Sequence, residues 1–293
     1  MPTLEWRKRL DLLVQPPQLI IEPTGPGNPA YKRNIVLQKS DAERFALIDA
    51  DAYPRMDWLG KGLPLLQKNV TVVTGPNLTP PHDHFSRRIS GRVMESPIGF
   101  GPAYIRHVPK QRQYVNEMPT CNMIIRRQRG IVFREDLNTS EDMMYCLEIR
   151  AKGQKVLYDP DVVVFHHRRK ILRPFMKQFY NYGLDKGRLR KSKSDVSYIW
   201  QAAPAFFSLY AAGLLVLLPW IHDHFLYRAL CAPVFLYLLA VVVESIRLSQ
   251  SYKEIFVAPF AFLAGHIGYG IGFIRGFFLR DPLNTTEDLT CLK

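Results

Sequence analysis

The feature that most constrains this chain is a run of 20 residues without a charged side chain, from Ala202 to Ile221. A helix of this length and composition can cross the ~30 Å hydrocarbon core of a bilayer. Two further apolar stretches follow, Phe225 to Ile246 and Ile255 to Phe278, and the last is rich in glycine, which suits close helix packing in lipid. The sequence therefore predicts three transmembrane helices within residues 201–280, in preference to three buried helices of a soluble core, and a polar tail over residues 281–293.

Positive charge gathers immediately before the first of these stretches. Between His166 and Lys193, ten Lys and Arg residues stand against one acidic residue, Asp185. By the positive-inside rule, this flank and the domain before it are expected to be cytoplasmic, in a multi-pass protein of the cell (inner) membrane. Aromatic residues are interleaved with the charges. This favours a basic amphipathic segment, residues 166–200, that lies on anionic lipid, and it argues against nucleic acid as the partner.

The same rule predicts the sides on which the later loops lie. The loop Arg247 to Glu254 is expected inside and the loop His222 to His224 outside, so three spans would put the C-terminus outside. Arg275 and Arg280, at the far end of the third stretch, argue against this. A re-entrant third segment or a different topology therefore remains open.

The composition of the whole chain excludes two other classes. The net charge is +13, but 47% of the residues are hydrophobic, which is too apolar for a disordered polycation. The four cysteines form no C-x-x-C pair, so neither a disulfide framework nor a structural zinc site is indicated.

The first half of the chain alternates between predicted strands and helices. Apolar or β-branched runs bounded by turn residues predict strands at 19–22, 45–48, 70–73, 156–158 and 162–165. Helical spacing predicts helices at 31–42 and 141–152; Ser140 is a candidate N-cap of the second, which stops at Gly153. Residues 1–165 are therefore expected to form an α/β domain.

Two acidic spots carry the candidate chemistry. Asp49 and Asp51 follow an apolar strand directly, and the carboxyl end of a strand is where an open α/β sheet places ligand groups. Two such carboxylates can hold Mg²⁺ or Mn²⁺ against substrate phosphates, although a bare D-x-D without this context is more often a solvated, capping turn. The second spot, Glu141 and Asp142, begins a helix whose dipole keeps a carboxylate ionised as a base, with ordinary capping as the alternative.

The order of the motifs resembles that of a family 2 glycosyltransferase with the A-type fold. The resemblance covers roughly Leu19 to Arg190, and no single motif carries it. The matching segments are LIIEPTGPGNPAYKRN, FALIDADAYPRMDWL, PTCNMIIRR, SEDMMYCLEIRAKG, VLYDPDVVVFHHRR and KQFYNYGLDKGR, followed by the basic stretch and the spans.

This resemblance implies roles for individual residues. Asp49 and Asp51 would bind the metal and the donor diphosphate, and Asp142, with Glu141 beside it, would be the base that deprotonates the acceptor hydroxyl. Asn122 would contact the donor sugar. His166 or His167 would complete the metal or phosphate site, with capping of the strand end as the alternative. Lys32 and Arg33 would bind donor phosphate, or else are surface charge on their helix.

Two departures from the family pattern qualify these roles. The chain starts at what resembles the helix after the family's first strand, Thr3 to Val14, so part of the nucleotide pocket is expected to be missing. The Q-x-x-R-W motif of processive members is absent near Gln178, which favours the addition of one sugar.

These expectations together predict a membrane-anchored, inverting, metal-dependent glycosyltransferase. It would move a sugar from a nucleotide-diphospho-sugar donor to an envelope polysaccharide, a lipopolysaccharide or a lipid-linked acceptor. A non-catalytic relative that acts as a membrane partner or scaffold is the alternative, and hydrolysis of a nucleotide sugar is a third possibility.

Overall fold

The computed structural model describes residues 27–137, 139–189 and 199–279, and these fall into two compact units. Among the described residues, the first unit contains 27–82 and Ile105–His167, and the second contains Asp83–Tyr104 and the residues from Arg168 to 279. The predicted strand at 19–22 and the predicted helix Thr3 to Val14 lie outside the described residues. Residues 83–104 were predicted within the α/β domain, whereas their contacts group them with the C-terminal helices.

A five-stranded sheet forms the centre of the first unit, with strand order β1-β6-β3-β7-β5. Its strands are β1 (Arg44–Leu47), β3 (Val70–Thr74), β5 (Gln113–Val115), β6 (Met123–Arg126) and β7 (Lys155–Tyr158). β3 and β7 are parallel, and β6 runs antiparallel to both β1 and β3. β1, β3 and β7 therefore run in one direction and end at the same edge of the sheet.

A second, three-stranded sheet has the order β2-β8-β4. Its strands are β2 (Ala52–Pro54), β4 (Asn77–Leu78) and β8 (Val164–His166). β2 and β8 are antiparallel, in a register that pairs Ala52 with His166. The strand predicted at 162–165 is found at Val164–His166, shifted toward His166.

Helices cover both faces of the large sheet. α2 (Pro29–Lys39) and α6 (Glu141–Ala151) lie on one face, and α3 (Trp58–Gly62), with the 3₁₀ turn η1 (Leu63–Leu65), belongs to the core of the other. Side chains of a strand alternate between the faces. Val72, Ile125 and Val156 pack toward α2 and α6, while their neighbours Val73, Ile124 and Leu157 pack toward α3. Burial on both faces explains why these strands are continuous apolar runs, and each such side chain contributes about 1.5–3 kcal/mol to folding.

The directions of α2 and α6 bring their first residues to one place. Each helix leads through a short connection into a strand, α2 into β1 and α6 into β7. A helix that packs back on the strand it precedes runs antiparallel to that strand. The first turns of both helices therefore lie at the edge where β1, β3 and β7 end, which is also where Asp49 and Asp51 follow β1.

The second unit consists of helices. They are α4 (Phe85–Met94), α5 (Pro97–Phe100), α7 (Arg173–Leu189), η4 (Ile199–Ala202), α8 (Ala203–Leu217), η5 (Leu218–Trp220), α9 (His224–Leu248) and α10 (Tyr252–Phe278), while the 3₁₀ turn η2 (Gly101–Arg106) crosses from the second unit into the first at Ile105. Three of its helical segments are long and apolar enough to cross a membrane: Ala203–Trp220, His224–Leu248 and Tyr252–Phe278. The predicted fold class, an α/β domain followed by three apolar helices, is confirmed.

Candidate functional site

Three potential metal ligands meet at the edge of the first unit. Asp49 and Asp51 follow β1, and His166 ends β8. The pairing of Ala52 with His166 across β2 and β8 places the imidazole beside Asp51, with 3.0 Å between His166 Nε2 and Asp51 Oδ1. One ligand atom from each of the three side chains lies within 4.8 Å of the others. Two carboxylates and an imidazole nitrogen are a donor set that fits a divalent ion.

These three side chains are reachable from solvent. The carboxylates of Asp49 and Asp51 are each 36% exposed and the ring of His166 is 18% exposed. His167 takes a different place, since its backbone N–H donates to the Asp51 carbonyl and its ring lies 5.8 Å from that of Tyr53. Of the two candidate histidines, the structure therefore brings His166 to the aspartates.

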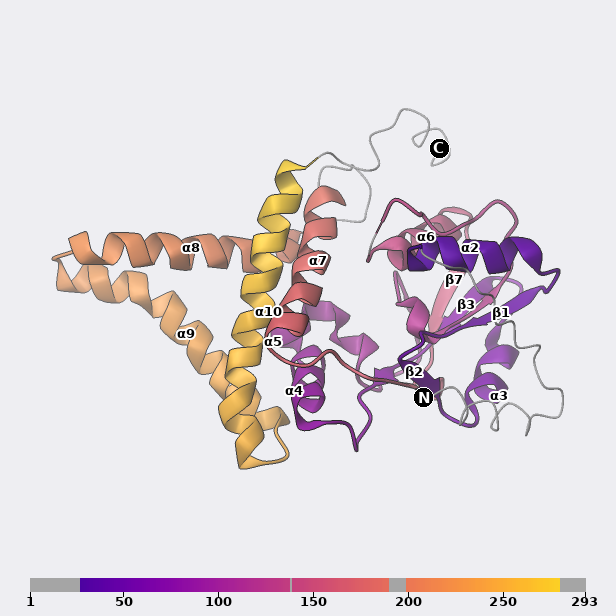
Figure 1. Cartoon of the computed structure of the whole chain (residues 1–293), viewed down its shortest axis with the longest axis horizontal. Coiled ribbons are helices and arrows are strands. Elements are labelled where there is room, and N and C mark those ends of the chain that lie inside the picture. The colour runs from indigo at the N-terminus through magenta and orange to yellow at the C-terminus, as the bar shows by residue number, and fades with distance from the viewer. Residues whose placement is uncertain (1–26, 138, 190–198, 280–293) are drawn as a thin grey trace. The chain divides into compact units, whose positions relative to one another are not determined.

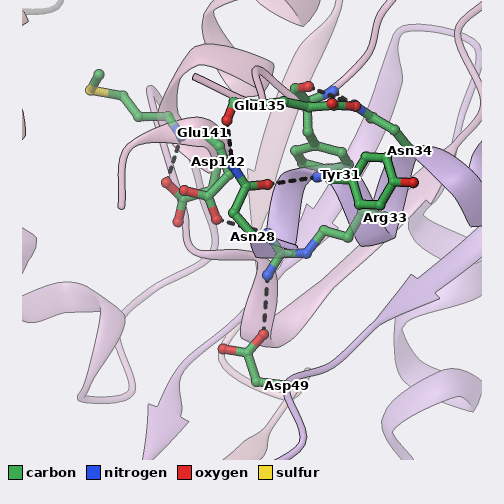
Figure 2. A network of polar contacts seen from close by, with 10 residues as sticks. Asn28, Tyr31, Arg33, Asn34, Asp49, Glu135, Glu141 and Asp142 are labelled. Atoms are coloured by element: carbon green, nitrogen blue, oxygen red, sulfur yellow. Dashed lines mark hydrogen bonds and ion pairs between the residues drawn. The ribbon is translucent and has the colours of Figure 1, made fainter. Parts of the chain in front are cut away.

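Arg33, on α2, connects this group with the start of α6. Its guanidinium donates to Asp49 Oδ1 at 3.2 Å and to Glu141 Oε1 at 2.7 Å, and it lies 5.5 Å from the centre of the Phe133 ring (Figure 2). Its side chain is 14% exposed. A planar guanidinium can bond two carboxylates at once, which a lysine ammonium does less well. Arg33 thus bonds both acidic spots that the sequence singled out.

The first turn of α2 is itself fixed by side-chain hydrogen bonds. Asn28 caps the helix by accepting from the Tyr31 N–H at 2.9 Å. The amide of the buried Asn34 donates to the Phe133 carbonyl at 2.7 Å and accepts from the Phe133 N–H at 2.8 Å (Figure 2). These bonds hold α2 against the segment that carries Phe133, and so they orient Arg33.

The start of α6 differs from the predicted cap. Ser140 is buried but makes no capping hydrogen bond with its side chain, and Asp142 Oδ1 instead accepts from the Met143 N–H at 2.7 Å. Glu141 is nearly buried, with Arg33 on its Oε1, while its Oε2 has no hydrogen-bond partner among the described residues. A buried, unpaired carboxylate oxygen is costly, and such atoms concentrate at functional sites.

Asp142 has the most perturbed carboxyl of the site. Burial, and next the negative charge of Glu141, raise the pKa of Asp142 to about 7, against the opposing effect of Arg106 and Arg33. Arg106 is itself paired with Glu117 at 2.6 Å. A carboxyl group with a pKa near neutrality can accept a proton at physiological pH. Arg106 and Glu117 were missed by the sequence analysis, because each is an isolated charge outside any motif.

Two other predicted donor contacts have different surroundings. Asn122 is fully buried in the core, where it accepts from Trp58 Nε1 at 2.8 Å and donates to the carbonyls of Pro76 and Val162 at 3.1 and 2.7 Å. Its amide is hydrogen-bonded within the protein, and its role as a sugar contact stays a prediction. Lys32 is half-buried on α2, next to Arg33.

Comparison with known proteins gives two informative matches. No family model matches the chain. The chain is 22% identical over 258 residues to a curated protein of Methanococcus voltae, with 84% of this chain and 74% of that protein covered; its name is dolichyl N-acetyl-alpha-D-glucosaminyl phosphate 3-beta-D-2,3-diacetamido-2,3-dideoxy-beta-D-glucuronosyltransferase. A solved structure, the mannosyltransferase PcManGT from Pyrobaculum calidifontis in complex with GDP-mannose and Mn²⁺, matches with a TM-score of 0.51 at 16% identity, over 86% of this chain and 69% of that one.

Both matches are glycosyltransferases, and the second shares the fold of this chain. Together with the acidic group at the sheet edge and the apolar helices, they support a glycosyltransferase with an A-type-like fold that is associated with a membrane.

Proposed function

We propose that this chain is a metal-dependent, inverting glycosyltransferase of the family 2 type, which transfers a single sugar from a nucleotide-diphospho-sugar to a lipid-linked acceptor at the cytoplasmic face of the membrane. One observation carries the proposal. The acidic group Asp49, Asp51 and His166 and the acidic start of α6 converge on one sheet edge, where Arg33 contacts both.

The first group fits the donor's diphosphate. A divalent ion, when bound, neutralises charge on the leaving diphosphate. Asp49, Asp51 and His166 would hold that ion; the imidazole nitrogen makes the set a better fit for Mn²⁺ than for Mg²⁺, which favours oxygen ligands. Mn²⁺ is also present in the complex of the mannosyltransferase that shares the fold. Arg33 would keep the carboxylates of Asp49 and Glu141 in place around the donor.

The start of α6 fits the acceptor. The acceptor hydroxyl would attack the anomeric carbon from the side opposite the diphosphate, so that the new C–O bond forms as the old one breaks and the configuration inverts. Asp142 would take the hydroxyl proton. Its raised pKa makes it a stronger base than an ordinary aspartate, whereas Glu141 is held by Arg33 and is better suited to orient the hydroxyl through its free Oε2.

The acceptor class follows from the membrane helices and from the curated relative. The name of that relative contains a dolichyl-linked sugar phosphate. A catalytic unit tethered by apolar helices meets such a lipid at the bilayer surface, where a soluble acceptor would gain nothing from the tether. We therefore propose a sugar linked to a polyprenyl-type phosphate as the acceptor, because a hydroxyl of that sugar supplies the proton that Asp142 would take.

The test is a transfer screen with the full chain in detergent or nanodiscs. UDP-, GDP- and dTDP-sugars are paired with dolichyl and polyprenyl phosphates and their sugar-linked forms, with Mn²⁺ or with EDTA, and products are read by mass spectrometry. Asp51→Asn removes the negative charge of one metal ligand, and the same change at Asp57, an exposed carboxylate paired with Arg55, is the matched control.

The outcomes separate the functions. A glycosylated lipid that requires Mn²⁺ and is lost in Asp51→Asn but not in Asp57→Asn supports the proposal. Release of free sugar with every acceptor would identify a nucleotide-sugar hydrolase. Absence of both binding and turnover across the panel would favour the non-catalytic scaffold.

A further inference from the structure

The last apolar helix, α10, packs unusually close to α7. Glycines recur every four residues along one side of α10, at Gly268, Gly272 and Gly276. A Cβ on Gly272 would lie 2.0 Å from the Tyr180 carbonyl oxygen, and one on Gly276 would lie 2.1 Å from that of Leu184. Real Cβ atoms do not approach so closely, so these positions require glycine.

The facing side of α7 has the same property. A Cβ on Gly183 would lie 2.1 Å from the Tyr269 carbonyl oxygen, and one on Gly187 would lie 2.3 Å from that of Phe273. In these contacts, residues further along α7 meet residues further along α10. α7 and α10 are therefore parallel and in direct backbone contact over several turns (Figure 1). As a consequence, α7 must lie at the same depth in the bilayer as the second half of α10.

α7 is unsuited to the interior of a bilayer. It carries five charged residues: Arg173, Lys177, Asp185, Lys186 and Arg188. A charged side chain at the centre of a transmembrane helix costs about 2.5–3.5 kcal/mol on translocon-insertion scales. If α10 crossed the membrane, it would bring these charges to the depth of its second half. The packing of α7 thus opposes a transmembrane α10.

The first half of α10 also has a polar helix beside it. Glu254, 1% exposed, pairs with Arg88 at 3.4 Å and with Arg92 at 3.6 Å, both from α4. Apolar residues of α4 and α10 pack together next to these ion pairs. Charged helices therefore accompany α10 along both halves of its length.

The uncovered side of α10 is a narrow apolar stripe. Five large side chains at spacings of four and seven residues share one face: Phe256, Phe260, Ile267, Ile271 and Phe278, which are 72%, 65%, 44%, 46% and 78% exposed. A helix that exposes one apolar stripe and packs other faces against charged helices has the pattern of a helix that lies in the bilayer surface.

α8 and α9 have different surroundings. The contacts of Gly270 place α10 against Pro204 and Ser208, in the first turns of α8, and Tyr237, in the second half of α9, bonds His266 at 2.7 Å. Further out the two helices contact each other, with the Tyr210 hydroxyl donating to the Leu230 carbonyl. In the most apolar stretch of each helix, only 11% of the residues are buried in α8 and 17% in α9, against 39% in α10. Their surfaces suit lipid on nearly all sides.

We propose that α8 and α9 form a two-helix membrane hairpin, while α10 lies in the plane of the bilayer surface with its phenylalanine and isoleucine stripe in lipid and α4 and α7 on its aqueous side. The 18 residues Ala203–Trp220 lie within the range of about 17–25 residues found in helices that cross the hydrocarbon core. Two spans return the chain to its starting side. Arg275 and Arg280 then lie on the same side as the basic segment before α8, as the positive-inside rule requires. This inference does not depend on the proposed catalytic activity.

The first test is the sidedness of three cysteines in sealed membrane vesicles of defined orientation, read with a membrane-impermeant maleimide. Asp136→Cys, 44% exposed at the wild-type side chain, marks the α/β unit, and His222→Cys marks the tip of the hairpin; both are made in a Cys231→Ser, Cys291→Ser background. The native Cys291, in a Cys231→Ser background, marks the tail. We expect Cys291 to be labelled from the same side as position 136 and position 222 from the opposite side. Labelling of Cys291 from the side of position 222 would overturn the proposal.

The second test measures depth along α10 in the full chain. Spin labels at cysteines replacing Phe256, Ile267 and Phe278, one at a time, are compared for collision with oxygen and with a water-soluble nickel complex. An in-plane helix gives the three positions similar, shallow depths. A midpoint at Ile267 that is much deeper than both ends would show that α10 spans the membrane and would refute the proposal.

Discussion

Asp51 and His166 meet side by side because β2 and β8 pair antiparallel with Ala52 opposite His166, which leaves 3.0 Å between the imidazole Nε2 and the carboxylate. His167, one residue further along, is directed to Tyr53 instead. The register of two short strands thus selects which histidine can join the aspartates in binding a metal ion.

This relationship predicts a difference between two neighbouring substitutions. His166→Ala should weaken Mn²⁺ binding about tenfold or more, which corresponds to roughly 1.4 kcal/mol, because one ligand of three is lost. His167→Ala should leave the affinity within about twofold of the parent. Titration of free Mn²⁺ by electron paramagnetic resonance measures both. Equal losses in the two variants would show that the histidine acts through the fold and not as a ligand.

Arg33 and Lys32 form a second matched pair. Arg33→Gln removes the cation between Asp49 and Glu141 and leaves the nearly buried Glu141 carboxylate unpaired, so we expect a loss of roughly 1–3 kcal/mol in stability. Lys32→Gln, on the same turn of α2, should change stability by about 0.5 kcal/mol or less. Thermal melting in detergent and metal-free buffer gives the comparison. A melting temperature of Arg33→Gln equal to that of Lys32→Gln would contradict the bridging role.

The raised pKa of Asp142 predicts how its charge affects stability. An ordinary aspartate has a pKa of 3.8, whereas the pKa of Asp142 in the folded protein is about 7, so the folded state binds the proton more tightly than the unfolded state and stability falls as pH rises between these values. Asp142→Asn removes this penalty. The variant should be more stable than the parent by roughly 1–3 kcal/mol at pH 8, and the difference should shrink toward pH 5.

Melting temperatures of both proteins at each pH provide the measurement, with Asp136→Asn as the control for an exposed acid. A difference between the Asp142 variant and the parent that does not vary with pH would show that the Asp142 carboxyl titrates normally.

The close contact of α7 and α10 predicts a strong effect of one methyl group. Gly272→Ala places a Cβ against the Tyr180 carbonyl and should destabilise the protein by about 1–3 kcal/mol, with earlier tryptic cleavage in α7. Gly213→Ala, on α8 with no atom within 4 Å of its Cβ position, should be neutral or stabilising by up to about 1 kcal/mol. Similar cleavage rates of α7 in the two variants would show that the contact between α7 and α10 tolerates a side chain at position 272.

Parts of this protein that depend on local pattern could be predicted from its sequence. The strands near 45–48, 70–73 and 156–158 and helices α2, α6, α8, α9 and α10 follow from apolar runs, helical spacing and length, and the structure confirms them. α4 was not predicted, because its apolar residues Ile89 and Val93 are separated by Ser90, Gly91 and Arg92 and find their partner face on α10, far along the chain.

The site was predictable in its motifs but not in its connections. β1 and α6 run in opposite directions, so the end of β1 with Asp51 and the start of α6 with Asp142 lie at one edge of the sheet. The sequence had predicted the strand end and the helix start that carry these residues. The choice of His166 over His167 depends on strand register, and the burial of Asn122 depends on Trp58, 64 residues away, bonding its amide. Such long-range contacts leave no local signal in the sequence.

The central claim, that these groups together transfer a sugar, is tested most directly by separating donor binding from turnover in Asp142→Asn. The variant keeps the shape and hydrogen bonding of the side chain but cannot accept a proton. We expect its donor affinity with Mn²⁺ to match that of the parent, while kcat falls by about 10²–10⁴-fold and the rise of kcat through pH 7 disappears. Turnover of Asp142→Asn near the parent rate, with the same pH profile, would contradict the account.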